Sequence, residues 1–245
     1  MSRPPYLTKP RWLVGHVIVV ALAVLFVNLG FWQLRRLDER RQHNALVLAR
    51  SATTTALADG GPLPYRRVTA TGTFDPNHEL LARFRSRNGL PGYEVVTPLV
   101  TGVGPVVLVD RGWVPLDAGD HWPVASAAPP TGEVTVTGLL APSEGGGVRL
   151  ERRAGQAPVI GSIDVAALER AKAVTEGDVY PLHLIAETTT PATAANYPAP
   201  VDPPDLGEGP HLSYAFQWFS FATVGVVGWI VLLARRARKP EPDDE

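Results

Sequence analysis

The sequence predicts a membrane protein in which two transmembrane α-helices flank an extracytoplasmic, mainly-β (α+β) domain, a small barrel or sandwich. Three observations support this fold class. Two long uncharged apolar runs lie near the two ends of the 245-residue chain. Short alternating segments rich in β-branched residues fill the middle. The 24 prolines and 23 glycines disfavour long helices outside the apolar runs.

The first apolar run covers residues 12–34, which is long enough for a helix to cross a hydrocarbon core of about 30 Å. A cleaved signal peptide has a shorter apolar region and a small-residue cleavage site, whereas this run leads into the charged sequence LRRLDERR. We therefore expect a short N-terminal segment at 1–11, a retained transmembrane helix at 12–34, and a juxtamembrane helix at 35–50.

The second run predicts a transmembrane helix at 211–234 and a tail at 235–245. It is followed by four basic residues: Arg235, Arg236, Arg238 and Lys239. Because basic residues favour the cytoplasm, we expect both termini of this multi-pass protein to be cytoplasmic, at the plasma membrane. The arginines after the first run favour the opposite orientation, but long loops translocate largely regardless of charge.

The β-rich domain is expected at 51–190, followed by a proline-rich linker at 191–210. Six segments have the alternation of strands: 67–74, 78–84, 93–100, 105–114, 133–141 and 182–188. The segment 164–172 predicts the one helix of this domain, because Asp164 can cap it. A single-layer sheet leaves one face without a core, so a barrel or sandwich is favoured.

Composition and spacing exclude several function classes. A net charge of −1 gives no electrostatic basis for binding nucleic acid. The absence of cysteine removes disulfides, thiolate catalysis and the common structural zinc sites. The six histidines contain no chelating pair at short spacing, and no nucleophile or phosphate-loop fingerprint is present. We therefore expect no enzyme and assign no catalytic residue. The alternative of a membrane-anchored hydrolase or transferase lacks a nucleophile–base motif in this sequence.

A cluster of unusual residues ends the apolar strand at 107–115, where Asp110, Arg111, Gly112 and Trp113 follow one another. Two interpretations remain open. Arg111 can pair with Asp110 or a carbonyl while Trp113 packs in the core, which makes a structural corner. Alternatively, the cluster is a binding surface. The tendency of aromatic side chains to be buried favours the corner.

The second apolar run begins with His211, and helical spacing places Tyr214 and Trp218 on its face together with small residues. That face could seat a flat ligand such as a porphyrin, with His211 offering its imidazole to iron. Arg35 or Arg36 could then meet acidic propionates. The alternative, which the residues alone favour, is an interfacial aromatic belt in which His211 caps a helix.

Several blocks of the sequence resemble the Surfeit-locus (Shy-type) family of cytochrome c oxidase assembly factors. They are LGFWQLRRLDER (29–40), YRRVTATGTFD (65–75), GYEVVTPL (92–99), VLVDRGWVP (107–115), EVTVTGLL (133–140) and HLSYAFQWFSFA (211–222). These blocks span both apolar runs and most of the region between them.

The resemblance implies that the chain assists insertion of haem a into the oxidase catalytic subunit, with His211 as ligand of the iron and haem a held transiently. The side chains expected around the ring and its propionates are Tyr214, Trp218, Trp32, Arg35 and Arg36. The expected partner contacts are Arg111, Gly112, Trp113 and Gln33. Partners would be the catalytic subunit, neighbouring oxidase or supercomplex subunits, and membrane lipid. The alternative is a scaffold that binds no haem and stabilises the oxidase or a respiratory supercomplex.

Overall fold

The structure is a computed structural model that describes residues 10–102, 104–147, 149–151, 157–192 and 196–238. The chain forms two compact units. We call residues 1–45 with 205–245 the helical unit, and residues 46–204 the β unit.

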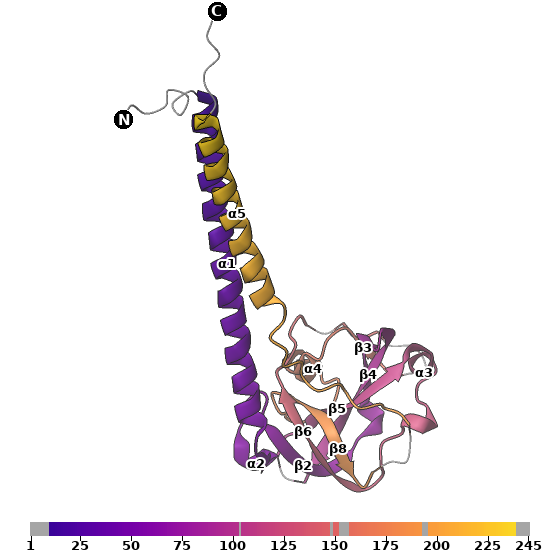
Figure 1. Cartoon of the computed structure of the whole chain (residues 1–245). Coiled ribbons are helices and arrows are strands. Elements are labelled where there is room, and N and C mark those ends of the chain that lie inside the picture. The colour runs from indigo at the N-terminus through magenta and orange to yellow at the C-terminus, as the bar shows by residue number, and fades with distance from the viewer. Residues whose placement is uncertain (1–9, 103, 148, 152–156, 193–195, 239–245) are drawn as a thin grey trace, which may run out of the picture. The chain divides into compact units, whose positions relative to one another are not determined.

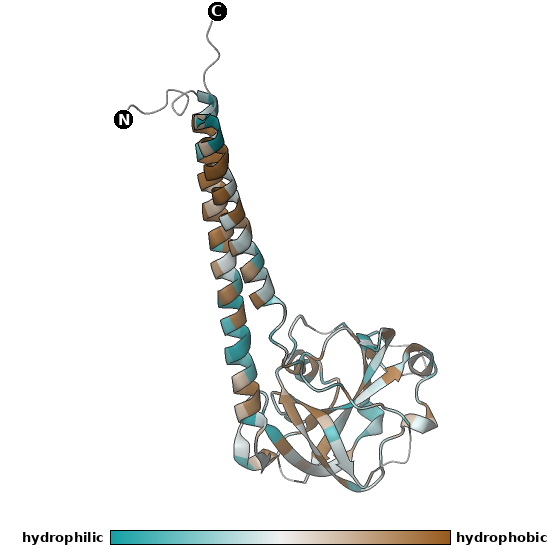
Figure 2. Cartoon of the chain, in the orientation of Figure 1, coloured by the Kyte–Doolittle hydropathy of each residue, from teal (hydrophilic) through white to brown (hydrophobic). Residues whose placement is uncertain are grey.

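The helical unit is built by α1 (Pro10–Ser51) and α5 (His211–Ala237), which lie side by side and antiparallel (Figure 1). Both helices are long and apolar enough to cross a membrane. Figure 2 shows hydrophobic residues along the paired stretch of both helices, and α1 becomes hydrophilic beyond it. The expected helices at 12–34 and 35–50 are one continuous helix, and α5 continues three residues beyond the predicted end at 234.

A row of shielded positions recurs every three or four residues along α1, the spacing by which helices pack against a partner. The row consists of Trp12, His16, Val19, Ala23, Phe26, Gly30, Gln33, Leu37, Arg40 and Asn44. Small residues allow close approach: a Cβ atom at Gly30 would lie 2.5 Å from Phe219. Ala215 and Ala222 of α5 are buried for the same reason.

The β unit contains eight strands. They are β1 (Thr54–Ala56), β2 (Arg67–Phe74), β3 (Leu80–Arg87), β4 (Leu90–Thr101), β5 (Val107–Pro115), β6 (Glu133–Ala141), β7 (Val159–Ile160) and β8 (His183–Thr190). The sheet order is β1-β2-β6-β8-β5-β4-β3-β7, and an additional β2–β4 pairing closes the sheet into a barrel. Among the described residues, three short α-helices lie between these strands, α2 (Leu57–Gly60), α3 (Leu116–Asp120) and α4 (Val165–Arg170), together with two 3₁₀ helices, Pro76–His78 and Ala125–Ala127.

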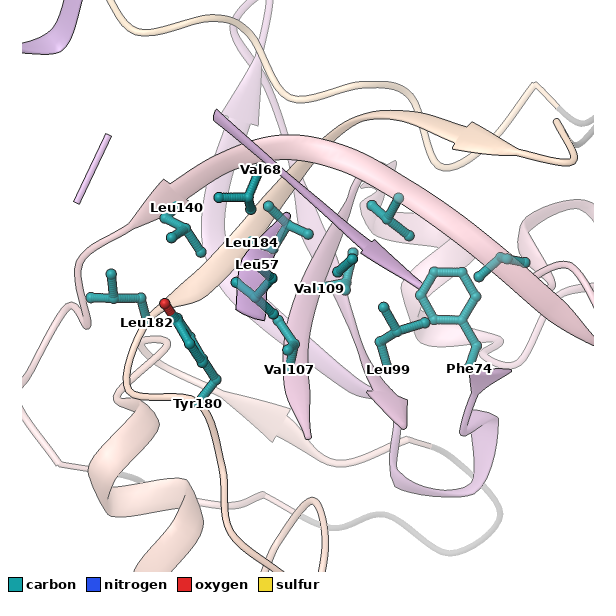
Figure 3. Close-up of a cluster of buried hydrophobic side chains, with 13 residues drawn as sticks. Leu57, Val68, Phe74, Leu99, Val107, Val109, Leu140, Tyr180, Leu182 and Leu184 are labelled. Atoms are coloured by element: carbon teal, nitrogen blue, oxygen red, sulfur yellow. The ribbon is translucent and has the colours of Figure 1, made fainter. Parts of the chain in front are cut away.

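The barrel is filled by side chains that point inward from its strands (Figure 3). The completely shielded members of this cluster are Val68, Leu99, Val107, Val109, Val136, Leu140 and Leu184. They come from β2, β4, β5, β6 and β8, where apolar residues alternate with polar ones or form continuous buried runs. Of the two architectures left open by the sequence, the structure therefore has the barrel.

The predicted elements agree with the structure where local periodicity is strong. The strands expected at 67–74 and 133–141 match β2 and β6. The expected helix at 164–172 is the shorter α4, and Asp164 caps it by accepting a hydrogen bond from the Ala167 amide at 3.1 Å. The sequence did not predict the other two short helices, α2 and α3. Elements of so few residues carry no readable period.

Part of the predicted linker at 191–210 is an edge of the β unit. Ala199 exchanges two backbone hydrogen bonds with Trp113 of β5, at 2.7 and 2.8 Å. Gly112 permits this approach, since its φ is +129° and a Cβ atom there would lie 2.2 Å from the Ala199 oxygen. Residues 193–195 of the expected linker lie outside the described residues.

Candidate functional site

His211 is the first residue of α5, and its imidazole Nδ1 lies 2.8 Å from the side-chain oxygen Oε1 of Gln33. Gln33 belongs to the shielded row of α1 and is 9% exposed. The two residues are 178 positions apart in the sequence. The antiparallel packing of α1 and α5 brings them together at the end of the helix pair where α5 begins.

The segment before His211, Asp205–Gly209, is bound to α1 by polar side chains of the same row. Arg40 donates from Nε to the Gly207 carbonyl at 3.0 Å, and from Nη2 to the Asp205 carbonyl at 2.8 Å. Asn44 donates to the Leu206 carbonyl at 2.6 Å. Arg40 and Asn44 were not singled out from the sequence, although they continue the three-and-four spacing beyond the apolar run. They determine where the first turn of α5 starts.

An ion pair adds to this attachment on its exposed side. Arg41 binds the carboxylate of Glu208 through both Nε and Nη2, at 2.7 and 2.9 Å. Hydrogen bonding from Arg41 lowers the pKa of Glu208 below its usual value. Both side chains are about half exposed, so solvent screens the pair and its contribution to the stability of the segment is small.

A cavity of about 340 Å³ lies beside His211. Its lining includes Arg36, Glu39, Arg40, His43, Asp205, Glu208, Gly209 and His211. The charges are mixed, because three carboxylates accompany two arginines, and Arg36 pairs with Glu39 at 2.7 Å. Such a lining suits a polar group, but its net charge does not favour an anion over a cation.

The structure brings together only some of the residues expected around a ligand. Arg36 lines the cavity with His211, whereas Arg35 does not. Trp218 stacks on Phe26 of α1 with ring centroids 5.6 Å apart, so its indole serves helix packing. The other two expected ring neighbours, Tyr214 and Trp32, are 46% and 47% exposed and are absent from the lining. Their contact with a ligand stays a prediction.

The strand-end cluster lies in the interior of the β unit. Arg111 donates to Glu79 at 2.9 Å and to the Ala127 carbonyl at 2.7 Å. Trp122 donates to the other oxygen of Glu79 at 2.9 Å, and the Thr97 hydroxyl also donates to this carboxylate. Arg111 pairs with Glu79 rather than with Asp110, one of the partners considered from the sequence, and burial lowers the pKa of its guanidinium.

This geometry supports the structural-corner interpretation. The Arg111 side chain is 6% exposed and the Trp113 residue 7%, and Gly112 is buried under the 197–200 segment. Partner contact through these three residues stays a prediction. The same is true of Gln33, whose oxygen is occupied by His211.

A second buried ionisable group, which the sequence did not indicate, lies between β3, β4, β5 and β8. Arg85 lies 2.6 Å from Glu94 and 2.5 Å from Glu144. Burial and the nearby Glu94 raise the pKa of Asp110 well above its usual value. Burial lowers the pKa of His183 to about 4, and the Nδ1 atom of this ring has no hydrogen-bond partner. The members of this group come from separate segments of the sequence, between residues 85 and 183, which is why no local spacing revealed it.

Within the described residues, no three histidine or acidic side chains are arranged to hold a metal ion.

Comparison with known proteins gives these observations a context. The profile of the SURF1 family matches residues 20–223, which include part of each span, the barrel, Gln33 and His211. The chain belongs to the SURF1 family. An uncharacterized SURF1-like protein of Mycobacterium tuberculosis is 31% identical over 99% of this chain and 94% of its own length.

Other SURF1 relatives match a smaller part. A SURF1-like protein of Rickettsia felis is 37% identical over 40% of this chain and 45% of its own length. The cytochrome oxidase assembly protein SHY1 of Saccharomyces cerevisiae is 31% identical over 40% of this chain and 27% of its own length. The expected family is therefore confirmed.

Proposed function

We propose that this SURF1-family chain is a membrane-bound assembly factor of cytochrome c oxidase. Membership of the family and the name of the yeast relative support this role. The fold is consistent with it, because a barrel anchored by two spans can act beside a membrane-embedded subunit. The partners are the oxidase catalytic subunit and its neighbours, and the chain acts without catalysing a reaction.

We place the β unit on the extracytoplasmic side of the plasma membrane. Arg235 and Arg236 lie in the last turn of α5, where basic residues favour the cytoplasm. An even number of spans returns the N-terminus to the same side. Labelling of single cysteines introduced at residues 2 and 170 of this cysteine-free chain tests the orientation. With a reagent that does not cross the membrane, we expect the cysteine at residue 170 to react in intact cells. Reaction of the cysteine at residue 2 alone would show the opposite orientation.

The finer proposal is that the chain carries haem a to the oxidase, with His211 as ligand of the iron. The contact between His211 and Gln33 carries it, because an imidazole oriented by a second side chain is the usual arrangement of a metal-binding histidine. The Nε2 edge of the ring faces Gly209, where the missing side chain leaves space. The residues present therefore fit a haem cargo through one axial ligand.

The size of the cavity limits how this cargo would be held. Pockets for drug-sized ligands span roughly 300–1,000 Å³, and the cavity beside His211 lies at the small end. It would admit only part of a tetrapyrrole, beside His211. Loose holding of this kind suits a group that is passed on.

The scaffold without haem is the second candidate, and one observation favours it. Trp218 stacks on Phe26, and Arg36 pairs with Glu39, so both are accounted for by contacts within the chain. A scaffold would use the β unit and the spans to hold oxidase subunits together.

The visible spectrum of the protein purified from cells that make haem a separates the candidates. Wild type and His211→Ala are compared, with His121→Ala as control because His121 is exposed in the β unit and bonds only within its own turn. Haem bands in wild type and control that are lost in His211→Ala support the carrier. A colourless wild type that still co-purifies oxidase subunits supports the scaffold and rejects the carrier.

A further inference from the structure

We propose that Gln33 is a positioning residue that holds the His211 ring with its proton on Nδ1, so that Nε2 is the nitrogen free to coordinate. The use of that nitrogen for haem rests on the proposed function. The position of the proton does not, and it can be measured on the protein alone.

The chemistry of the contact determines the proton position. The atom of Gln33 that lies 2.8 Å from Nδ1 is the amide oxygen, which can only accept a hydrogen bond. Nδ1 must therefore donate. A neutral imidazole has a single proton, so Nε2 carries the lone pair. Within the described residues, Nε2 makes no hydrogen bond that would compete with a metal.

A second histidine on the same helix pair provides the opposite case. Nδ1 of His16 lies 2.9 Å from Nε1 of Trp229, and an indole N–H can only donate. The His16 Nδ1 atom therefore accepts, and its proton lies on Nε2. The two rings differ because His211 faces an acceptor and His16 faces a donor, so that of these two rings His211 is the one with an unprotonated Nε2.

The place of Gln33 in the fold makes it able to orient the ring. Its side chain is shielded between α1 and α5, in the row that also contains Gly30 and Leu37. The backbone of His211 is held independently by the attachment of Asp205–Gly209 to Arg40 and Asn44. The backbone attachment leaves the imidazole free to rotate, and the hydrogen bond that Nδ1 donates to the Gln33 oxygen removes that freedom.

Gly209 independently indicates that the Nε2 edge is kept accessible. Its φ is +70°, and a Cβ atom built there would lie 3.5 Å from both Cδ2 and Nε2 of His211. A methyl group at this position would occupy the space through which a metal approaches Nε2. Alanine at this φ is also strained, whereas glycine is not.

The first experiment measures the proton position without haem. Full-length protein with ¹⁵N-labelled histidine is studied in detergent at pH 8 by NMR correlations that distinguish the two neutral forms of the ring. His211 and His16 are assigned by the signals lost in His211→Ala and His16→Ala. We expect the Nδ1-protonated tautomer at His211 and the Nε2-protonated tautomer at His16. In Gln33→Leu, we expect His211 to populate both neutral tautomers instead of one. An Nε2-protonated His211 in wild type, or an unchanged ring in Gln33→Leu, would overturn the proposal.

The second experiment titrates the purified variants with haem a. Gln33→Leu should weaken binding by about 10–100-fold, the usual effect of removing the partner of a metal-binding histidine. Gln33→Glu keeps an acceptor and should retain binding. Gln42→Leu is the matched control, because Gln42 lies exposed on α1 and bonds to Asp38 of its own helix. Equal affinity of wild type and Gln33→Leu would overturn the positioning role while the carrier function stands.

The two failures can be told apart. If His211 has the expected Nδ1 proton and loses it in Gln33→Leu, but neither wild type nor variants bind haem a, the positioning role of Gln33 is supported and the carrier function is rejected. If wild type binds haem a and His211→Ala does not, but the proton of the His211 ring lies on Nε2, the carrier function is supported and the role of Gln33 is rejected.

Discussion

The guanidinium of Arg111 lies 2.9 Å from the carboxylate of Glu79, and both side chains are more than nine-tenths buried in the β unit. Glu79 also receives hydrogen bonds from Trp122 and Thr97, so its charge is fully surrounded by donors. This network joins β4, β5 and the segment that contains Trp122 to Glu79, the residue immediately before β3.

Removing Arg111 should strongly destabilise the β unit. Arg111→Ala leaves the Glu79 carboxylate buried without a counter-charge, which costs about 3–5 kcal/mol of unfolding free energy. Chemical unfolding of the full-length protein in detergent measures it. Arg170→Ala is the control, since Arg170 is exposed on α4 and should change stability by less than about 0.5 kcal/mol. Wild-type stability in Arg111→Ala would show that the network is not a structural one.

Gly112→Ala should release the 197–200 segment from β5. The added Cβ atom would lie 2.2 Å from the Ala199 oxygen at a φ of +129°, so backbone must move and about 1–3 kcal/mol is lost. Limited proteolysis is expected to cut the variant near residue 199 while wild type resists. Gly102→Ala is the matched change, because nothing lies within 4 Å of a Cβ atom there. Equal resistance of Gly112→Ala and wild type would contradict this role.

His183 should make the β unit less stable as the pH falls. Its folded-state pKa is lowered to about 4 by burial, whereas the unfolded chain takes up the proton near the ordinary value of about 6.5. Between these values the unfolded state binds more protons, so stability present at pH 7 is lost as the pH falls towards 4. The full difference is roughly 3 kcal/mol.

The measurement compares the pH dependence of unfolding in wild type and His183→Gln, whose side chain does not titrate. Glu144 and Arg85 act on His183 in opposite directions and are the same in both proteins. A smaller loss of stability below pH 6.5 is expected in His183→Gln, and His121→Ala should behave as wild type. Parallel curves for wild type and His183→Gln would exclude the buried imidazole as the cause.

Arg40→Ala should loosen the segment that leads into His211. The variant loses two hydrogen bonds to backbone carbonyls, each worth roughly 0.5–1.5 kcal/mol, and an exposed contact with the Asp205 carboxylate that adds little. The Gly207 amide should exchange hydrogen at least about tenfold faster. Arg41→Ala should have a smaller effect because the Arg41–Glu208 pair is exposed to solvent. A greater effect of Arg41→Ala than of Arg40→Ala would reverse this ranking.

Sequence reasoning located the spans and the longer strands because those features are local. An apolar run of sufficient length becomes a membrane helix wherever it lies, and the alternation in 67–74 and 133–141 requires only neighbouring residues. It missed β1 and β7, whose three and two residues are too short to show a period. It also treated the segment around Ala199 as linker, because pairing with Trp113 depends on a strand far away in the sequence.

For the candidate site, the sequence alone singled out His211, Gln33 and Arg36, because polar residues at the end of an apolar run are unusual. It assigned Gln33 to a partner and grouped Tyr214, Trp218 and Trp32 around His211. Only the packing of α1 against α5 decided that Gln33 binds His211 and that Trp218 stacks on Phe26. Residues 178 positions apart have no local signal of contact. Their contact depends on the antiparallel register of α1 and α5, and on the polar end of the shielded row of α1, where Asn44 binds the segment before His211.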